Sequence, residues 1–287
     1  MPTPPLDPRI NPFRPDLAAE ALRGLVAAPR FATPVPRRVI AGLAPLRRAP
    51  SPEASLETQA LFGEAVDVFD EDEGWAWVQL KRDGYVGYLP AADLAAPRTA
   101  THVVTALRTH AYPAPSIKAP PALALPMGAL LCVEGGRAPF LALADGLYVY
   151  ASHAAPLGGR APDFVSIAER FLNAPYLWGG RSSEGVDCSG LAQGALRMAG
   201  LAAPRDADML EASIGAPLDP LTRDLKRGDL VFWKGHVGVM RDAANLLHAS
   251  GHHMMVVGEP LAEAIRRTQE KGGGEVTSIR RPELLKA

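Results

Sequence analysis

The C-terminal half of the sequence holds one cysteine and two histidines whose surroundings suit nucleophilic chemistry. Cys188 follows Asp187, which can cap a helix that runs to about Ala199. The N–H groups at a helix start stabilise negative charge, and the thiolate is the nucleophilic form of cysteine. His236 and His248 lie in short apolar segments twelve positions apart, a spacing that suits neighbouring antiparallel strands. One histidine can then act as base toward Cys188 while the other orients it.

Two simpler interpretations compete with this one. A cysteine at a helix start is often only a small buried residue, and a histidine in a strand is often structural. Cys188, His236 and His248 also have the ligand types of a zinc site. His252 and His253 add at most one ligand, because adjacent residues of a strand point to opposite faces.

The segment after Gly158-Gly159 predicts helices first and strands after them, which is typical of an α+β domain. Asp163 can cap a first helix, and the helix from Cys188 ends before Gly200. Another helix is expected from Pro260 to about Lys271. Strands are expected at 229–233, 236–240, 246–250, 254–258 and 275–280.

The N-terminal half predicts mainly short strands. Residues 51–98 alternate apolar and polar side chains around turn signals such as Asp83-Gly84, which indicates a small β-barrel. Residues 101–153 are again β-rich and predict a second, degenerate barrel. Before them, Asp16 is expected to cap a short helix from Leu17 to Val26. The expected domains are an extension at 1–37, barrels at 38–98 and 99–157, and an α+β domain at 158–287.

Composition limits the functional classes. The chain has 287 residues and a formal charge of −1, so no overall field attracts nucleic acid or an anionic membrane. Two cysteines cannot build a disulfide framework. The N-terminus lacks the pattern of a secretory signal, and no apolar run has the length of a membrane span, so a cytoplasmic protein is expected.

The local motifs resemble known families. Gly63-Glu64, Gly74-Trp75 and the segment from Gly84 to Pro90 resemble a bacterial SH3-like domain. Six motifs between residues 160 and 287 resemble the NlpC-type papain-like peptidases in the order of that family. They are Pro175-Tyr-Leu-Trp-Gly-Gly, Asp187-Cys-Ser-Gly-Leu, Pro204-Arg-Asp, Gly228-Asp-Leu-Val-Phe-Trp, His236-Val-Gly-Val and His248-Ala-Ser.

The resemblance implies a role for each residue of the candidate site. The nucleophile is expected at Cys188, the general base at His236 and the orienting residue at His248. The backbone N–H of Cys188 and the hydroxyl of Tyr176 are candidate donors to the oxyanion. Trp178 is a candidate for contacting substrate, with core packing as the alternative for both aromatic residues. No metal or organic cofactor is expected.

The same arrangement of barrels and peptidase resembles γ-D-glutamyl-L-diamino acid endopeptidases of the dipeptidyl-peptidase VI type. That resemblance implies cleavage of murein peptides such as L-Ala-γ-D-Glu-diaminopimelate in wall-peptide recycling, with a site for the free amine of L-Ala. Candidates for that site are Asp187 and Ser189, together with Tyr85 and either Glu64 or Glu57 of the first barrel. The alternatives are a Cys–His amidase or acyltransferase and a catalytically idle module that binds wall peptides.

Overall fold

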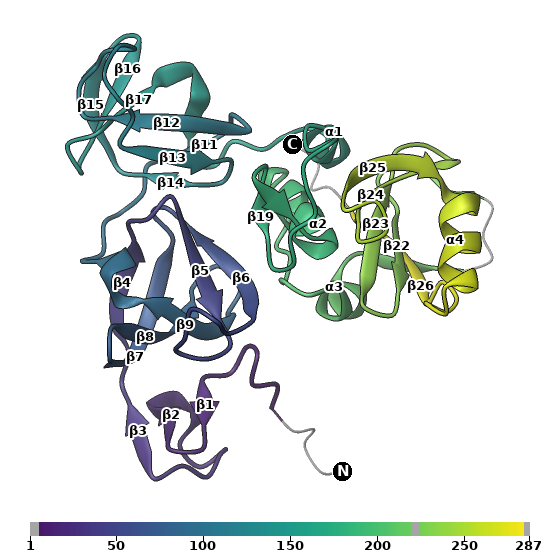
Figure 1. Ribbon diagram of the computed structural model, residues 1–287, viewed down its shortest axis with the longest axis horizontal. Helices are drawn as coiled ribbons and strands as arrows, with labels where there is room; N and C mark the ends of the chain where they lie inside the picture. The colour runs from purple at the N-terminus through teal and green to yellow at the C-terminus, as the bar shows by residue number, and fades with distance from the viewer. Residues whose placement is uncertain (1–5, 220–223, 284–287) are drawn as a thin grey trace. The chain divides into compact units, whose positions relative to one another are not determined.

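The computed structural model describes residues 6–219 and 224–283, so residues 1–5 of the expected extension lie outside it. The chain forms two compact units, Met1–Leu157 and Gly158–Ala287. Figure 1 shows that the first is built almost entirely of strands, whereas the second combines helices with a sheet. Among the described residues, none of the helices has the length and apolarity needed to cross a membrane.

The N-terminal segment forms a small sheet in place of the expected helix from Leu17 to Val26. Its strands are β1 (Phe13–Arg14), β2 (Leu17–Ala19) and β3 (Arg30–Ala32), and one 3-10 turn follows at Glu20–Leu22. All three residues of β2 are buried, and β2 pairs with both β1 and β3. Asp16 accepts hydrogen bonds from Arg14 and Arg30 and caps no helix. Strand pairing and burial therefore override the helical pattern that the sequence suggested.

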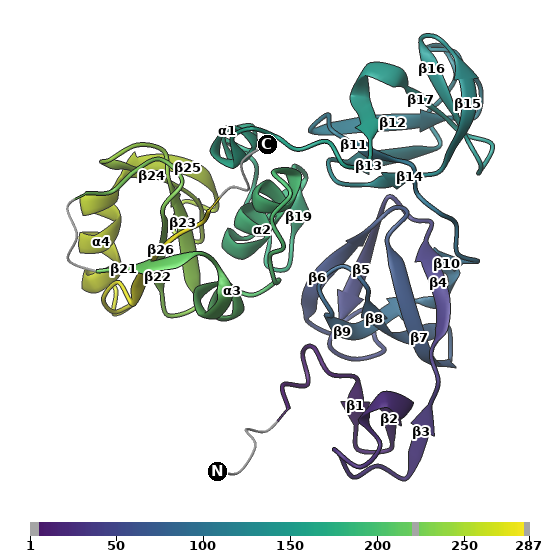
Figure 2. The ribbon, with the colours of Figure 1, turned by 180° about the vertical axis from the view of Figure 1, so that it is seen from behind.

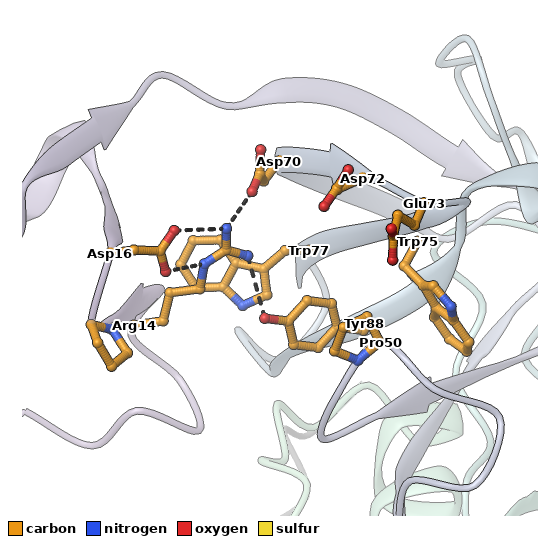
Figure 3. A pocket seen from close by; sticks show the side chains of 10 residues that line it. Arg14, Asp16, Pro50, Asp70, Asp72, Glu73, Trp75, Trp77 and Tyr88 are labelled. Atoms are coloured by element: carbon orange, nitrogen blue, oxygen red, sulfur yellow. Dashed lines mark hydrogen bonds and ion pairs between the residues drawn. The ribbon is translucent and has the colours of Figure 1, made fainter.

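Arg14 fixes this segment to the first β unit (Figure 3). Its guanidinium carbon lies 4.8 Å from the ring centre of Trp77, and its nitrogens donate to Asp16, Asp70 and the Tyr88 hydroxyl. A cavity of about 330 Å³ lies beside these side chains. A cation stacked on an aromatic ring and paired with carboxylates stabilises the contact between two chain segments.

The first β unit is an antiparallel sheet with the strand order β10-β4-β7-β8-β9-β5-β6. Within residues 35–95, all of which the structure describes, no pairing joins β6 to β10. The expected closed barrel is therefore an open SH3-like sheet, whose edge strand β10 is only two residues long. Alternating apolar residues of these strands, among them Val66, Val78 and Leu89, form its buried core. The strands are β4 (Val35–Val39), β5 (Leu43–Arg47), β6 (Leu56–Leu61), β7 (Ala65–Asp72), β8 (Trp75–Leu80), β9 (Val86–Pro90) and β10 (Leu94–Ala95).

The second β unit repeats the pairing order of the first with its own core. Strand β11 pairs with β14 and β18, as β4 pairs with β7 and β10, and the order β15-β16-β17-β12-β13 corresponds to β7-β8-β9-β5-β6. The Val39 N–H donates to the Glu64 carbonyl at 2.9 Å, and the Val104 N–H donates to the Ala129 carbonyl at 2.9 Å. Its strands are β11 (His102–Val104), β12 (Arg108–Tyr112), β13 (Leu123–Pro126), β14 (Leu130–Leu131), β15 (Val133–Arg137), β16 (Phe140–Leu143), β17 (Tyr148–Tyr150) and β18 (Ala154–Pro156). The 3-10 turns Ala91–Asp93 and Ala151–His153 precede the last strand of each unit.

The second compact unit places helices on two sides of a six-stranded sheet with the order β21-β26-β22-β23-β24-β25. Figures 1 and 2 show α2 on one side and α4 on the other. The strands are β21 (Ala216–Leu218), β22 (Leu230–Trp233), β23 (His236–Met240), β24 (Asn245–Ser250), β25 (Met255–Pro260) and β26 (Ser278–Arg281), and a separate hairpin joins β19 (Arg181–Ser182) to β20 (Gly185–Val186). The helices are α1 (Phe164–Glu169), α2 (Cys188–Met198), α3 (Ala207–Ser213) and α4 (Leu261–Glu270).

The sequence predicted most of these elements. The Asp163 carboxylate accepts from the Val165 N–H at 2.9 Å and caps α1, as expected. Helix α2 ends before Gly200, whose φ of 83° is a conformation that glycine adopts without strain. Helix α3, strand β21 and the hairpin of β19 and β20 were not predicted from the sequence. The SH3-like N-terminal part and the α+β C-terminal part are both confirmed.

Replacing Arg14 with Met should loosen the N-terminal segment. The side chain is 20% exposed and bonds to three partners, so we expect a loss of about 1–3 kcal/mol in the stability of the first unit. Hydrogen exchange measured by mass spectrometry should show faster exchange in β1 and β2. Arg266→Gln is the matched control, because its ion pair with Glu270 is exposed and lies in the second unit, and exposed pairs contribute little to stability. Equal protection in Arg14→Met and wild type would contradict the role of Arg14.

Candidate active site

Cys188 is the first residue of α2 and is buried, with 7% of its surface exposed. Asp187 precedes it in an extended conformation and caps the helix, since its carboxylate accepts the Gly190 N–H at 2.6 Å. Leu191 and Leu196 on the buried face of the helix hold it against the rest of the unit. The candidate nucleophile Cys188 therefore lies at the capped start of α2, as the sequence predicted.

Burial changes the expected charge of the thiol. Burial first, and the nearby Asp187 carboxylate second, raise the pKa of Cys188 to about 12. Hydrogen bonds from the backbone N–H groups of Val237 and Ser189, and the charge of Arg205, act in the opposite direction with smaller effect. The thiolate expected from the helix position is therefore not the resting state, because desolvation outweighs the helix start.

The Asp187 carboxylate is fully engaged within the fold. One oxygen accepts from Arg205 Nη1 at 3.0 Å, and the other accepts from Arg205 Nη2 at 2.6 Å and from the Gly179 N–H at 2.8 Å. Ser189 Oγ donates to the carboxylate at 3.3 Å and accepts from Arg205 at 2.8 Å. With the Gly190 contact these donors use the four or so acceptor sites of a carboxylate. Asp187 and Ser189 therefore hold α2 and Arg205 in place, and their expected part in a site for the substrate amine stays a prediction.

His236 and His248 lie on neighbouring strands and contact each other directly. Strand pairing places Val239 opposite Leu247, so the two histidines are diagonal neighbours on one face of the sheet. His236 Nε2 is 2.7 Å from His248 Nδ1, and the ring centres are 5.0 Å apart. The Cys188 thiol lies beside the backbone N–H of Val237, the residue after His236. The structure therefore brings the three predicted residues together.

The imidazole of His236 is neutral at physiological pH. Burial, followed by the influence of His248 and Arg267, lowers the pKa of His236 to about 3, while Asp187 and Glu259 act in the opposite direction. A neutral imidazole beside a protonated thiol is a base ready to accept the thiol proton. The resting pair is therefore thiol and imidazole, and proton transfer accompanies the attack on substrate.

Glu259 is a polar residue of the site that the sequence reading missed. Its Oε1 is 2.7 Å from His248 Nε2, and Arg267 donates to both of its oxygens. Strand pairing puts His248 opposite Val257 and Leu246 opposite Glu259, so Glu259 is the next diagonal neighbour across the sheet. The expected strand after His248 ended at Gly258, whereas β25 continues to Pro260, so Glu259 lay one residue beyond the predicted strand.

Tyr176 and Trp178 lie on the loop before β19. Burial, followed by the charges of Cys188 and Asp187, raises the pKa of Tyr176, so its phenol keeps its proton. Trp178 is 62% exposed, which excludes the core-packing alternative for this residue. The loop also needs Gly180, because a Cβ there would lie 2.3 Å from the Gly185 carbonyl oxygen. The paired glycines serve close packing of the chain on itself.

The three candidate residues of the first β unit have different environments. Tyr85 is 3% exposed and belongs to the core of that unit. Glu64 is 2% exposed, accepts from the Leu61 N–H at 3.1 Å and pairs with Arg82, so it stabilises a turn. The carboxylate of Glu57 forms an ion pair with Arg48 at 2.8 Å and is partly exposed.

The zinc interpretation finds no support in the described part of the chain, where no three or more His, Cys, Asp or Glu side chains are arranged to hold a metal ion. In the pair at the site, the nitrogens of His236 and His248 point at each other and are hydrogen-bonded. Metal ligands would instead direct their lone pairs at a common point.

Comparison with known proteins identifies the family. Residues 46–94 match the bacterial dipeptidyl-peptidase SH3 domain, and residues 173–271 match the NlpC/P60 family. The chain is 33% identical to a γ-D-glutamyl-L-lysine dipeptidyl-peptidase of Bacillus subtilis over 68% of its own length and 72% of that protein. It is 30% identical to dipeptidyl-peptidase 6 of Lysinibacillus sphaericus over 74% of this chain and 86% of that one. The fold is similar to that of an NlpC/P60 family protein from Bacillus cereus, with a TM-score of 0.72 at 23% identity over 86% of this chain and 99% of that one. The chain therefore belongs to the NlpC/P60 family.

Proposed function

We propose that the protein is a cysteine endopeptidase that cleaves the bond between γ-D-glutamate and the diamino acid of murein stem peptides. The observation that carries the proposal is the contact of His236 with His248 beside the buried thiol of Cys188. The relatives named γ-D-glutamyl-L-lysine dipeptidyl-peptidase supply the substrate class. The arrangement by itself would also suit an amidase or acyltransferase, whereas an idle binding module would need no such chain of bonded groups.

The reaction follows from the geometry of the three residues. Cys188 Sγ attacks the γ-carbonyl carbon of D-Glu while His236 accepts the thiol proton. The backbone N–H of Cys188 and the phenol of Tyr176 are the proposed donors to the oxyanion. The C–N bond then breaks as His236 returns the proton to the amine of the diamino acid. Water hydrolyses the thioester, with His236 acting again as base, and the thiol is restored.

The substrate is proposed to carry a free N-terminal L-Ala. The name dipeptidyl-peptidase denotes removal of an N-terminal dipeptide, which supports this for relatives of the chain. A buried ammonium needs a paired charge, since leaving it unpaired costs several kcal/mol. Of the acidic residues expected in the first β unit, Glu57 has the carboxylate that is partly exposed. A requirement for free L-Ala would restrict the enzyme to peptides already released from glycan, which fits recycling of wall peptides in the cytoplasm.

We also infer that residues 99–157 are a second, degenerate SH3-like domain. The repeated strand order supports this, as do the matching turns at Gly63 and Gly128, whose φ angles are 80° and 88°. In the second unit the strand that corresponds to β7 is interrupted at Cys132, between β14 and β15. This interruption is where the second unit departs from the first in its pattern of strands.

The free-amine requirement can be tested with one pair of peptides. We expect L-Ala-γ-D-Glu-meso-diaminopimelate to be cleaved and its N-acetylated form to be cleaved at least about 100-fold more slowly, because acetylation removes the ammonium charge. Product analysis by chromatography and mass spectrometry measures both rates, with Cys188→Ala as the inactive control. Equal cleavage of the two peptides would contradict the requirement, and binding without any cleavage would favour the binding module.

The charge state of the thiol can be tested by alkylation across a range of pH. Because the raised pKa of Cys188 keeps the thiol protonated, its reaction with iodoacetamide should increase about tenfold per pH unit from pH 6 to pH 9. Peptide mapping follows Cys188 and the half-buried Cys132 separately, so Cys132 is an internal control. A constant, fast rate for Cys188 between pH 6 and pH 8 would instead reveal a preformed thiolate–imidazolium pair.

A further inference from the structure

We propose that Glu259, held in place by Arg267, is a positioning residue that determines which ring nitrogen of His236 carries the proton. The inference rests on the proposed function, because it concerns His236 as the base toward Cys188. It extends the site to a fourth and a fifth side chain, on β25 and α4. None of the sequence motifs at the site includes either residue.

The contacts form an unbroken chain across three strands and a helix. His236 Nε2 is 2.7 Å from His248 Nδ1, and His248 Nε2 is 2.7 Å from Glu259 Oε1. Arg267 Nη1 donates to Glu259 Oε2 at 2.6 Å, and its Nη2 donates to Oε1. The side chains of His248 and Glu259 are 5% and 10% exposed, so water competes little for these contacts.

Glu259 can only accept hydrogen bonds in this setting. Burial by itself would raise the pKa of Glu259, but hydrogen bonds from His248 and Arg267 lower it to about 2. The group is therefore a carboxylate at neutral pH, and a carboxylate has no proton to donate. The proton between Glu259 and His248 must then reside on His248 Nε2.

The position of that proton determines the next one. A neutral imidazole carries one proton, so His248 with a proton on Nε2 has a lone pair on Nδ1. Two lone pairs would repel at 2.7 Å, so His236 Nε2 must donate to His248 Nδ1. His236 then has its own lone pair on Nδ1, which is the nitrogen left for the proton of Cys188. The carboxylate thus imposes the tautomer that catalysis needs.

The same chain responds to charge during the reaction. When the S–H bond of Cys188 breaks, an N–H bond forms at His236 Nδ1 and the His236 ring becomes an imidazolium. The other charged groups around the pair are Arg267 and Asp187, and the titratable His253 has its Nε2 3.8 Å from Glu259 Oε2. Glu259 and Asp187 favour the cation and Arg267 opposes it. Without Glu259, Asp187 would be left among these groups to offset the effect of the Arg267 cation on His236.

Two substitutions separate hydrogen-bond acceptance from charge. Glu259→Met removes the acceptor for His248 Nε2, so the proton of His248 can move to Nδ1. His248 Nδ1 then donates to His236 Nε2, and the proton of His236 moves to its Nδ1. With a proton already on Nδ1, His236 cannot accept the proton of the Cys188 thiol. We expect at least about a 100-fold loss in kcat/KM. Glu259→Gln keeps an amide oxygen at the Oε1 position, which faces donors from both His248 and Arg267. It should retain the tautomer and lose activity to a smaller extent, through the missing charge.

The direct readout is the tautomer of each histidine in the full-length protein. Long-range proton–nitrogen NMR spectra of the 15N-histidine-labelled chain distinguish protonated from unprotonated ring nitrogens, and His236→Gln and His248→Gln assign the signals. Glu263→Gln is the matched control, because it removes one acidic charge from an exposed position of α4. Denaturant unfolding measures whether each variant is folded. If Glu259→Met does not fold, the tautomers and activity of Glu259→Gln still test the proposal.

In wild type, Glu259→Gln and Glu263→Gln, we expect His236 and His248 both to be protonated on Nε2. In Glu259→Met, we expect both rings to be protonated on Nδ1. Protonation of His248 on Nδ1 in wild type would overturn the proposal, as would activity of Glu259→Met within twofold of wild type. The NMR result needs no substrate, so it decides the tautomer separately from the proposed reaction. Failure of the wild type to cleave murein peptides would refute only the proposed function.

Discussion

The buried carboxylate of Asp187 is the interaction on which the catalytic unit most depends. It caps α2 at Gly190, holds the preceding loop through Gly179 and pairs with Arg205, which is 1% exposed. A buried charge is tolerated only when it is paired and hydrogen-bonded, and here a single group satisfies three segments of the chain at once. Loss of this carboxylate would remove an ion-pair partner from the buried Arg205 and would free the helix start that carries Cys188.

The same burial defines the chemistry of the site. A pKa of about 12 for Cys188 and of about 3 for His236 means that neither group carries charge before substrate arrives. Charge then develops only as the carbonyl is attacked, at a helix start that stabilises an anion and beside histidines that are linked to a carboxylate. Burial thus protects the thiol from unproductive reactions and leaves activation to the moment of attack.

The sequence predicted what is encoded locally and failed where distant partners decide. The cap of α2 and the pairing of His236 with His248 follow from short motifs and strand spacing, and the structure confirms both. The helix expected from Leu17 was wrong, because pairing with two other strands outweighs local periodicity. The ion pairs of Asp187 with Arg205 and of Glu64 with Arg82 were not predicted, because the partners lie 18 positions apart in sequence.

The central claim is that Cys188 forms a thioester with the γ-carboxyl group of D-Glu. The most direct measurement is peptide mapping by mass spectrometry after rapid acid quench of the enzyme with L-Ala-γ-D-Glu-meso-diaminopimelate. The account predicts an L-Ala-γ-D-Glu group on the peptide that contains Cys188, together with free diaminopimelate, and neither in Cys188→Ala. Release of diaminopimelate by Cys188→Ala at the wild-type rate would contradict it.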